Sequence, residues 1–446
     1  MKETNIEALL AKGDFLCECG RMHAAKLKKA VIRSGAIAEL PGILRGFGAE
    51  KAFVLADENT FAAAGEKVVS VLDGASVAYR SFIMGKERIE PGEHAVGSAL
   101  LHFDPTCDVL VSVGSGVIND IGKIIANTAN IPYVIVGTAP SMDGYASATS
   151  SVIRDDLKVS VDSKCPEVVI GDLDVLCESP VHMILSGIGD MLAKYISICE
   201  WRISNVINGE YYCERIAGLI NTALKKCVDN AEGVLTKDPE AVKAVMEGMV
   251  LSGIAANYAG VSRPVSGMEH YFSHVWDMRA IEFKTPSDLH GIQCGIGTVD
   301  SLRVYEKIRT LVPDKQKAIN YVASFDYDKW KEFLVKNLGK GADAMIINEA
   351  KERKYDREKH AARIDLIIGH WDEIIRIIDG LPSSEQTASL LRRLGAPVTA
   401  SDIGVSAEEE HNAFLMTKDI RDKYIGSRLL WDLGMLDEVA DELFPF

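Results

Sequence analysis

The chain has 446 residues, and two domains are expected because one hydrophobic core rarely organises so long a chain. Its 47% hydrophobic and 25% charged content is typical of a soluble globular protein, and the net charge of −15 argues against nucleic acid or an anionic membrane as a partner. No apolar run reaches the roughly 20 residues of a membrane-spanning helix, and the N-terminus lacks a signal-peptide core. Nine cysteines without framework spacing indicate reduced thiols, so we expect a cytoplasmic protein.

One short segment near the N-terminus combines two thiols with an imidazole. Cys17, Cys19 and His23 fall within seven residues, a spacing that can supply half of a zinc site. No second Cys or His pair stands nearby in the sequence to complete such a site. The favoured interpretation is therefore a turn before the strand expected at residues 30–35, without a metal.

The first 170 residues alternate between strand and helix patterns, which indicates a parallel sheet wrapped by helices. Strands are expected at residues 30–35, 52–56, 76–82, 108–113, 133–136 and 167–170, helices at 37–47, 93–103 and from 117, and a hairpin at 150–161. From about residue 180 the pattern is helical throughout. We therefore expect a nucleotide-binding α/β domain at residues 1–178 and an all-helical domain at 179–446.

The most informative stretch, residues 108–151, is a strand–helix–strand unit with two polar turns. The first strand runs directly into Gly114-Ser-Gly116, and the second ends in a turn that contains Thr138 and Ser141. Both turns follow parallel strands, where open α/β sheets bind ligands, and the first amides of the helix suit a pyrophosphate. The turn lacks the third glycine of the dinucleotide fingerprint. By itself it is therefore equally consistent with a nucleotide-binding turn and with a tight turn whose glycines serve only its geometry.

The strand expected at residues 52–56 also ends on polar side chains. Asp57 can accept hydrogen bonds from an adenosine ribose, although a solvated turn residue would look the same in the sequence. Asn59 or Thr60 is expected to cap the following helix.

Three places in the helical half concentrate metal-binding chemistry. Asp190 and Lys194 are four residues apart on one predicted helix, His270 and His274 are likewise one turn apart, and His290 begins an apolar helix. One carboxylate and two or three imidazoles suit a divalent metal with an open, catalytic coordination position. Singly, each has an ordinary explanation, such as a surface ion pair. Together with the glycine turn they favour a metal enzyme.

These motifs together resemble a known group of enzymes. The patterns GSG-x3-D-x2-K at 114–123, GxGD-x3-K at 187–194, GxEHxxSH at 267–274 and LHG at 289–291 are similar to those of the dehydroquinate synthase-like, or iron-containing alcohol dehydrogenase, superfamily. Within it, TAPSMDGYASATSSV and SGMEHYFSH resemble the sn-glycerol-1-phosphate dehydrogenases, especially the longer bacterial branch. The resemblance covers roughly residues 15–310 and implies a Rossmann-like domain followed by an all-α domain.

The resemblance also implies roles for individual residues. Asp190, His270 and His290 match metal ligands, and His274 and Asp143 match substrate contacts, with His274 suited to relay the alcohol proton. The positions that match cofactor contacts are Asp57, Gly114, Ser115, Gly116, Asp120, Thr138, Ser141 and Ser147. Ser115 stands where relatives often have glycine. Zinc, nickel and iron all suit these ligands, and NAD is favoured over NADP because Asp57 would repel a 2′-phosphate.

The implied reaction is reversible hydride transfer from NAD(P)H to dihydroxyacetone phosphate, giving sn-glycerol 1-phosphate, in an enzyme that is a homodimer by default. Arg263, Lys194 and Lys284 are candidates to bind the substrate phosphate. One alternative is a polyol dehydrogenase acting on an unphosphorylated substrate. Another is a dehydroquinate synthase-type lyase, which would need basic residues that the run 137–153 lacks. A third, a nucleotide-binding regulatory protein without catalysis, is disfavoured because the metal positions are retained.

Overall fold

The computed structural model describes residues 5–87 and 89–446 and contains two compact units. The first comprises Met1–Met191 and Arg215–Val261, and the second comprises Leu192–Glu214 and Ser262–Phe446. The expected division at residue 178 lies where the strands end. The first compact unit, however, also includes residues 179–191 and 215–261, which follow the last strand. The chain therefore passes between the units more than once.

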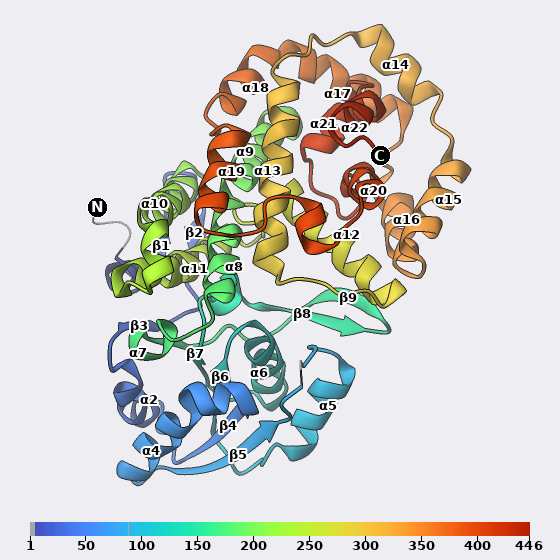
Figure 1. The fold of residues 1–446 in the computed structure, drawn as a ribbon. Coiled ribbons are helices and arrows are strands. Elements are labelled where there is room, and N and C mark those ends of the chain that lie inside the picture. Colours follow the sequence, from blue (N-terminus) through green and yellow to red (C-terminus); the bar gives the residue numbers. More distant parts are fainter. Residues whose placement is uncertain (1–4, 88) are drawn as a thin grey trace. The chain divides into compact units, whose positions relative to one another are not determined.

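The first unit is built on a six-stranded parallel sheet of order β3-β10-β7-β6-β4-β5 (Figure 1). All six expected strands are present: β3 (Lys29–Arg33), β4 (Lys51–Asp57), β5 (Ala78–Met84), β6 (Val109–Gly114), β7 (Tyr133–Gly137) and β10 (Val168–Asp172). The expected Rossmann-like sheet is thus confirmed.

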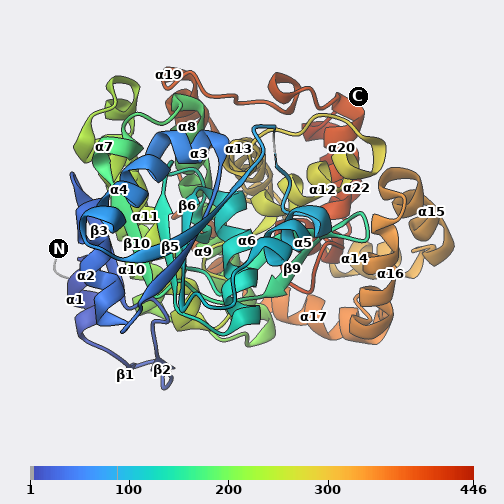
Figure 2. The ribbon, with the colours of Figure 1, turned by 90° about the horizontal axis from the view of Figure 1, so that it is seen from below.

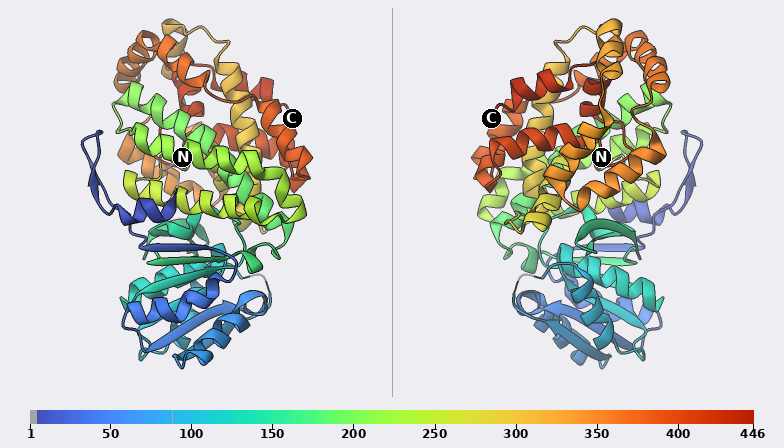
Figure 3. Two further views of the ribbon diagram at one scale, coloured as in Figure 1. Left: turned by 90° about the vertical axis from the view of Figure 1, so that its left-hand side faces the viewer. Right: turned by 90° about the vertical axis from the view of Figure 1, so that its right-hand side faces the viewer.

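Helices cover both faces of this sheet because its central strands are apolar on both sides. Val54, Val111 and Val134 belong to one core cluster with side chains of α2 (Leu40–Gly46) and α4 (Glu66–Gly74). The opposite face packs on α6 (Gly116–Ala129) and α5 (Glu93–His102). The two views of Figure 3 look onto these two layers, the blue helices on the left and the cyan ones on the right.

The remaining elements of the first unit are short or lie beside the sheet. The expected hairpin is β8 (Thr149–Arg154) with β9 (Leu157–Asp162), and a second hairpin pairs β1 (Phe15–Leu16) with β2 (Met22–His23). Figure 2 shows this β1–β2 hairpin as a short ribbon standing apart from the main sheet. The other helical segments are α1 (Ile6–Ala11), η2 (Ala36–Glu39), α3 (Glu58–Thr60), η3 (Phe61–Gly65), η4 (Asp143–Ala146), α7 (Leu173–Leu176), α8 (Val181–Leu192), α10 (Glu214–Asn230), η5 (Ala231–Thr236) and α11 (Pro239–Ala259).

The second unit is entirely helical over its described residues, as expected. Its elements are α9 (Lys194–Asn208), α12 (Met268–Phe283), α13 (His290–Ile308), α14 (Lys315–Ala323), α15 (Tyr327–Leu338), α16 (Gly341–Glu352), α17 (Arg357–Gly369), α18 (Trp371–Ile378), α19 (Ser384–Arg393), η6 (Ala400–Ile403), α20 (Ala407–Thr417), α21 (Gly426–Asp432) and α22 (Leu436–Leu443). None of the helices within residues 5–87 and 89–446 is long and apolar enough to cross a membrane.

One helix expected from the sequence is in fact two. Asp190 and Lys194 were expected on one face of a single helix, but α8 ends at Leu192 and α9 begins at Lys194. The break falls at Ala193, where the backbone forms a turn. The two side chains therefore belong to consecutive helices.

Candidate active site

The sheet of the first unit offers one place where topology favours ligand binding. β4 is followed by α4 on one face, whereas its neighbour β6 is followed by α6 on the other face. Such a reversal leaves a crevice at the carboxyl ends of the two strands. The register pairs Leu55 with Ser112, so Asp57 and Gly114, two residues further on, stand level at those ends.

The Gly114–Gly116 turn has the close packing that its glycines suggest. A Cβ on Gly114 would lie 2.5 Å from the Cβ of Ile118, so a side chain cannot be added without displacing α6. Ser115 is the N-cap of α6, at a φ of −108° that serine adopts without strain, and among the described residues its side chain makes no capping hydrogen bond. The first amides of α6 are thus left for another acceptor. Thr138 N–H donates to Gly114 O at 3.1 Å and ties the two predicted cofactor turns together.

Asp57 has a structural task besides its predicted contact with a ribose. Its Oδ1 accepts the Thr60 N–H at 2.7 Å, and Thr60 Oγ1 accepts the Asp57 N–H at 3.0 Å, which is a capping box. The expectation that Asn59 or Thr60 caps this helix was wrong, because the strand-end carboxylate reaches the amide three residues on and starts the helix earlier.

A lysine organises the loop that follows β7. Lys123 is fully buried, and its Nζ lies 3.1 Å from Asp120 Oδ1, 3.0 Å from Ser147 Oγ, and 2.6 and 3.1 Å from the main-chain oxygens of Gly144 and Thr149, among which its three hydrogens are shared. Asp120 and Ser147, both predicted cofactor contacts, therefore already share one protein partner. The GSG-x3-D-x2-K spacing contained this signal, since Asp120 and Lys123 lie one helical turn apart.

The structure brings two of the predicted acidic residues of the first unit, Asp143 and Asp190, together. Asp143 N–H donates to Asp190 Oδ2 at 2.9 Å, and Ser252 Oγ donates to Asp143 Oδ2 at 2.8 Å. Asp190 is fully buried on α8. A Cβ on Gly187 would lie 2.0 Å from Pro140 O, so the glycine allows α8 to approach the loop that contains Ser141 and Asp143.

In the second unit the three predicted histidines gather between α12 and α13. The ring centroid of His270 lies 5.1 Å from that of His290 and 6.4 Å from that of His274, and the rings of His274 and His290 are 6.0 Å apart. His270 is buried, and the other two are partly exposed. Two imidazoles at this separation suit one divalent ion.

A chain of hydrogen bonds fixes which nitrogen of His290 is available. Gln293 Nε2 donates to Asp277 Oδ1 at 3.1 Å, so Gln293 Oε1 accepts the hydroxyl of Ser273 at 2.7 Å. Ser273 Oγ has then used its proton and accepts from His290 Nδ1, 3.0 Å away. Nε2 of His290 consequently keeps its lone pair, as a metal ligand requires.

His270 is oriented in the same way by its neighbour in the sequence. Its Nδ1 lies 2.8 Å from Oε1 of Glu269, and the same oxygen accepts the Gly267 N–H at 2.6 Å. Burial raises the pKa of Glu269, but Oε1 remains an acceptor in either protonation state. A Cβ on Gly267 would lie 2.4 Å from Oε2 of Glu200, which explains the glycine of the GMEH motif. Nδ1 of His270 is therefore the nitrogen held by the protein, and Nε2 is the nitrogen that could bind a metal.

Sequence reasoning missed the groups that hold these histidines, and it missed a thiol beside them. Cys294 Sγ lies 3.6 Å from His290 Nε2, and one ligand atom each of His270, His290 and Cys294 fall within 4.8 Å of one another. The available signal was the four-residue spacing of His290 and Cys294, which places both on one face of α13.

The three candidates for phosphate binding differ in burial and in their contacts. Arg263 is buried, its Nε and Nη2 contact Glu210 at 2.6–2.8 Å, and its Nη1 donates to Tyr424 O at 3.0 Å. The structure therefore makes Arg263 an internal brace. Lys194 is also buried and donates to Val265 O at 3.0 Å, whereas Lys284 is exposed at the end of α12.

Comparisons with known proteins identify the family of this chain. Residues 31–180 match the family model described as iron-containing alcohol dehydrogenase. A Bacillus velezensis protein named glycerol-1-phosphate dehydrogenase (NAD(P)+) is 30% identical over 324 residues, which cover 69% of this chain and 80% of that protein. The chain belongs to the glycerol-1-phosphate dehydrogenase family. A Bacillus licheniformis member with the same name is 28% identical over 94% of this chain and 93% of its own length.

Solved structures of the wider fold resemble the chain as well. Glycerol dehydrogenase from Schizosaccharomyces pombe matches with a TM-score of 0.60 at 17% identity, over 94% of this chain and 90% of that one. Maleylacetate reductase from Agrobacterium tumefaciens matches with a TM-score of 0.61 at 13% identity, over 95% and 99% of the two chains. At such identities the likeness concerns the fold alone.

Proposed function

We propose that this chain catalyses the reversible NAD(P)H-dependent reduction of dihydroxyacetone phosphate to sn-glycerol 1-phosphate. The observation that carries the proposal is the pair of histidines, His270 and His290, each held through Nδ1 so that Nε2 remains for a metal. They occur in a chain of the glycerol-1-phosphate dehydrogenase family, whose members described above are named for glycerol 1-phosphate and NAD(P)+.

The proposed metal ligands are Asp190, His270 and His290. Asp190 contributes the buried carboxylate, already fixed by the amide of Asp143, and the two imidazoles contribute neutral nitrogen donors. This donor set suits zinc, nickel or iron in the divalent state. When bound, the ion supplies Lewis acidity to the substrate's carbonyl oxygen and the nicotinamide supplies the hydride.

The remaining roles fall to side chains that flank these ligands. His274, one turn after His270 on α12, would give the carbonyl oxygen the proton it takes up as hydride reaches the carbon. Asp143, held by Ser252, would accept a hydrogen bond from the substrate's hydroxyl. Among the basic candidates, the exposed Lys284 is the one we propose for the phosphate.

The cofactor is proposed to lie across the switch point between β4 and β6. Its pyrophosphate would meet the amides that follow Ser115, and its adenosine ribose would meet Asp57 at the same level of the neighbouring strand. The other proposed contacts are Gly114, Gly116, Asp120, Thr138, Ser141 and Ser147. A homodimer in the cytoplasm is the proposed state of the enzyme.

A paired rate assay tests this function directly. The metal-loaded protein is given NADH or NADPH with dihydroxyacetone phosphate and, separately, with dihydroxyacetone. We expect a strong preference for the phosphate ester, and chiral analysis should show sn-glycerol 1-phosphate. Equal rates on the two ketones would indicate a polyol dehydrogenase, and no oxidation of either cofactor would favour the lyase. Unchanged turnover in Asp190→Asn would contradict the metal site.

A further inference from the structure

The β1–β2 hairpin near the N-terminus has a turn that gathers ligand-type side chains. Cys17 N–H donates to Arg21 O at 2.9 Å, and Gly20 N–H donates to Cys17 O at 2.9 Å. Gly20 has a φ of +81°, which glycine adopts without strain. This tight turn puts Cys17 and Cys19 at the same end of the hairpin, next to His23 on β2.

The distances among these side chains are those of metal ligands. One ligand atom each of Cys17, Cys19 and His23 lie within 4.8 Å of one another, and Cys19 Sγ is 3.4 Å from His23 Nε2. In a tetrahedral zinc site, bonds of about 2.3 Å to sulfur and about 2.0 Å to nitrogen place those two atoms about 3.5 Å apart. The separation therefore accommodates an ion without a backbone shift.

The protonation of His23 also fits a metal ligand. Its Nδ1 lies 2.8 Å from the main-chain oxygen of Tyr258, and a carbonyl oxygen only accepts, so Nδ1 must carry the hydrogen. Nε2 is then the unprotonated nitrogen, and it is the atom that faces Cys19. A backbone carbonyl that orients the far nitrogen is a common second partner of metal-binding histidines. His23 is fully buried, so α11 fixes its ring.

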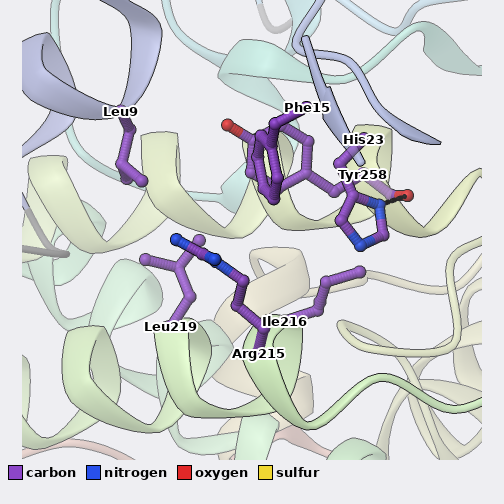
Figure 4. A pocket seen from close by; sticks show the side chains of 7 residues that line it. All are labelled: Leu9, Phe15, His23, Arg215, Ile216, Leu219 and Tyr258. Atoms are coloured by element: carbon purple, nitrogen blue, oxygen red, sulfur yellow. Dashed lines mark hydrogen bonds between the residues drawn. The ribbon is translucent and has the colours of Figure 1, made fainter. Parts of the chain in front are cut away.

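One small cavity lies beside His23, the histidine of the cluster. Figure 4 shows the rings of His23, Phe15 and Tyr258 together, with Arg215 reaching toward them. The cavity they line, about 10 Å³ in volume, has room for about one water. The guanidinium of Arg215 lies 4.7 Å from the centre of the Phe15 ring, so a positive charge stands beside this cavity.

We propose that Cys17, Cys19 and His23 bind a structural zinc ion, separate from the metal of the active site. Two thiolates and a neutral imidazole balance the charge of Zn²⁺, and the ion would fasten the hairpin to α11 through His23. Water or a further thiolate would complete the tetrahedron. Cys213 is the first thiol to test for that position, because it stands two residues before Arg215 in the chain.

Cobalt substitution of the full-length protein tests the proposal, because Co²⁺ bound to thiolates absorbs in the near ultraviolet. The parent for this test is Cys294→Ser, which removes the thiol beside His290 from the spectrum. We expect the thiolate–cobalt band in this parent, its loss in the added double variant Cys17→Ser/Cys19→Ser, and no change with Cys107→Ser, a buried cysteine elsewhere. A band that is absent from the parent, or that survives the double variant, would overturn the proposal.

A second measurement guards against variants that do not fold. The His290→Ala variant, with every cysteine retained, is purified with zinc and shown to be folded by its circular dichroism, and a mercurial thiol reagent is added while a metal-sensitive dye reports released zinc. We expect His290→Ala, which lacks an active-site ligand, to release about one equivalent of zinc per chain as its thiols react. Release of no zinc from this folded variant would refute the hairpin site. In the cobalt experiment, a weaker band in Cys213→Ser would support a third thiolate, and an unchanged band would support water.

Discussion

The two halves of the proposed active site are constructed differently. In the first unit the proposed cofactor region includes a backbone turn that is packed so tightly at Gly114 that an added Cβ has no room. In the second unit the metal region is made of side chains, with His270 and His290 each held by a buried partner. The first half depends on shape, and the second depends on hydrogen bonds.

This difference follows from what each ligand needs. A pyrophosphate is bound by amides that the start of any helix presents, so a strand, a glycine and a helix suffice. An imidazole has two nitrogens, and only a second hydrogen bond determines which one is available to a metal. The metal half therefore uses a second layer of residues, Glu269, Ser273 and Gln293, to select one nitrogen of each imidazole. In the cofactor half the supporting residue Lys123 only positions side chains beside the turns.

The largest effect is expected for the metal half when a ligand is removed. His290→Ala should lower kcat at least about 10³-fold, because the Lewis acidity of a bound ion contributes several kcal/mol and each 1.4 kcal/mol is tenfold in rate. Elemental analysis should show a loss of metal in parallel with activity. His370→Ala, an exposed histidine of the same unit, should leave both unchanged. Full metal occupancy in His290→Ala would show that His290 is not a ligand.

The second layer should respond less strongly. Ser273→Ala removes the acceptor for His290 Nδ1, and loss of such a partner typically weakens metal binding about 10–100-fold. Titration against a competing chelator measures this change, and Ser273→Thr should restore much of it because it keeps a hydroxyl. Ser301→Ala is the matched control, since among the described residues the buried hydroxyl of Ser301 on α13 has no hydrogen-bond partner. Equal metal affinity in the two alanine variants would contradict the orienting role.

The cofactor half should respond to added volume. Gly114→Ala places a methyl group 2.5 Å from Ile118, and such overpacking costs about 1–3 kcal/mol, so we expect about tenfold weaker binding of NAD(P)H and a lower Tm. Fluorescence titration of the reduced cofactor measures the first effect. The control is Gly97→Ala on α5, where nothing lies within 4 Å of an added Cβ, and Tm should rise slightly. Cofactor binding by Gly114→Ala at wild-type affinity would place the pyrophosphate elsewhere.

Most of the fold could be predicted from the sequence because its signals are local. The six strands of the sheet are short apolar runs, and the helical second half shows no alternating pattern, so both were identified. The bounds of the two compact units were not predicted. Helices α10 and α11 pack in the first unit, and no local sequence pattern indicates this. The break at Ala193 was missed since Asp190 and Lys194 have helical spacing across it.

The motifs predicted the candidate site residues, but they do not reveal the tertiary contacts between side chains that are far apart in the sequence. Nothing in the sequence links Ser273 to Gln293 and Asp277, because their contact depends on how α12 packs against α13. Likewise, the C-x-C-x3-H segment was interpreted as a turn without a metal because no second Cys or His pair stands nearby in the sequence. The carbonyl beside His23 Nδ1 belongs to Tyr258, 235 residues further on, and no local pattern reveals that contact. Arg263 was a candidate for the phosphate only until its contacts with Glu210 were known.

The smallest effect is expected for Asp57, a charged side chain of the proposed cofactor half. Asp57→Asn keeps the oxygen that caps α3, and asparagine caps helices about as well as aspartate, so Tm should stay the same. It removes the charge that would repel a 2′-phosphate, an interaction of about 1 kcal/mol near the surface, so the ratio of kcat/KM for NADPH over NADH should rise about fivefold. Glu58→Gln, an exposed neighbour, removes the same charge one residue away. If both variants shift the ratio equally, the general field of the protein sets the preference; a shift confined to Asp57→Asn indicates a direct contact with the ribose.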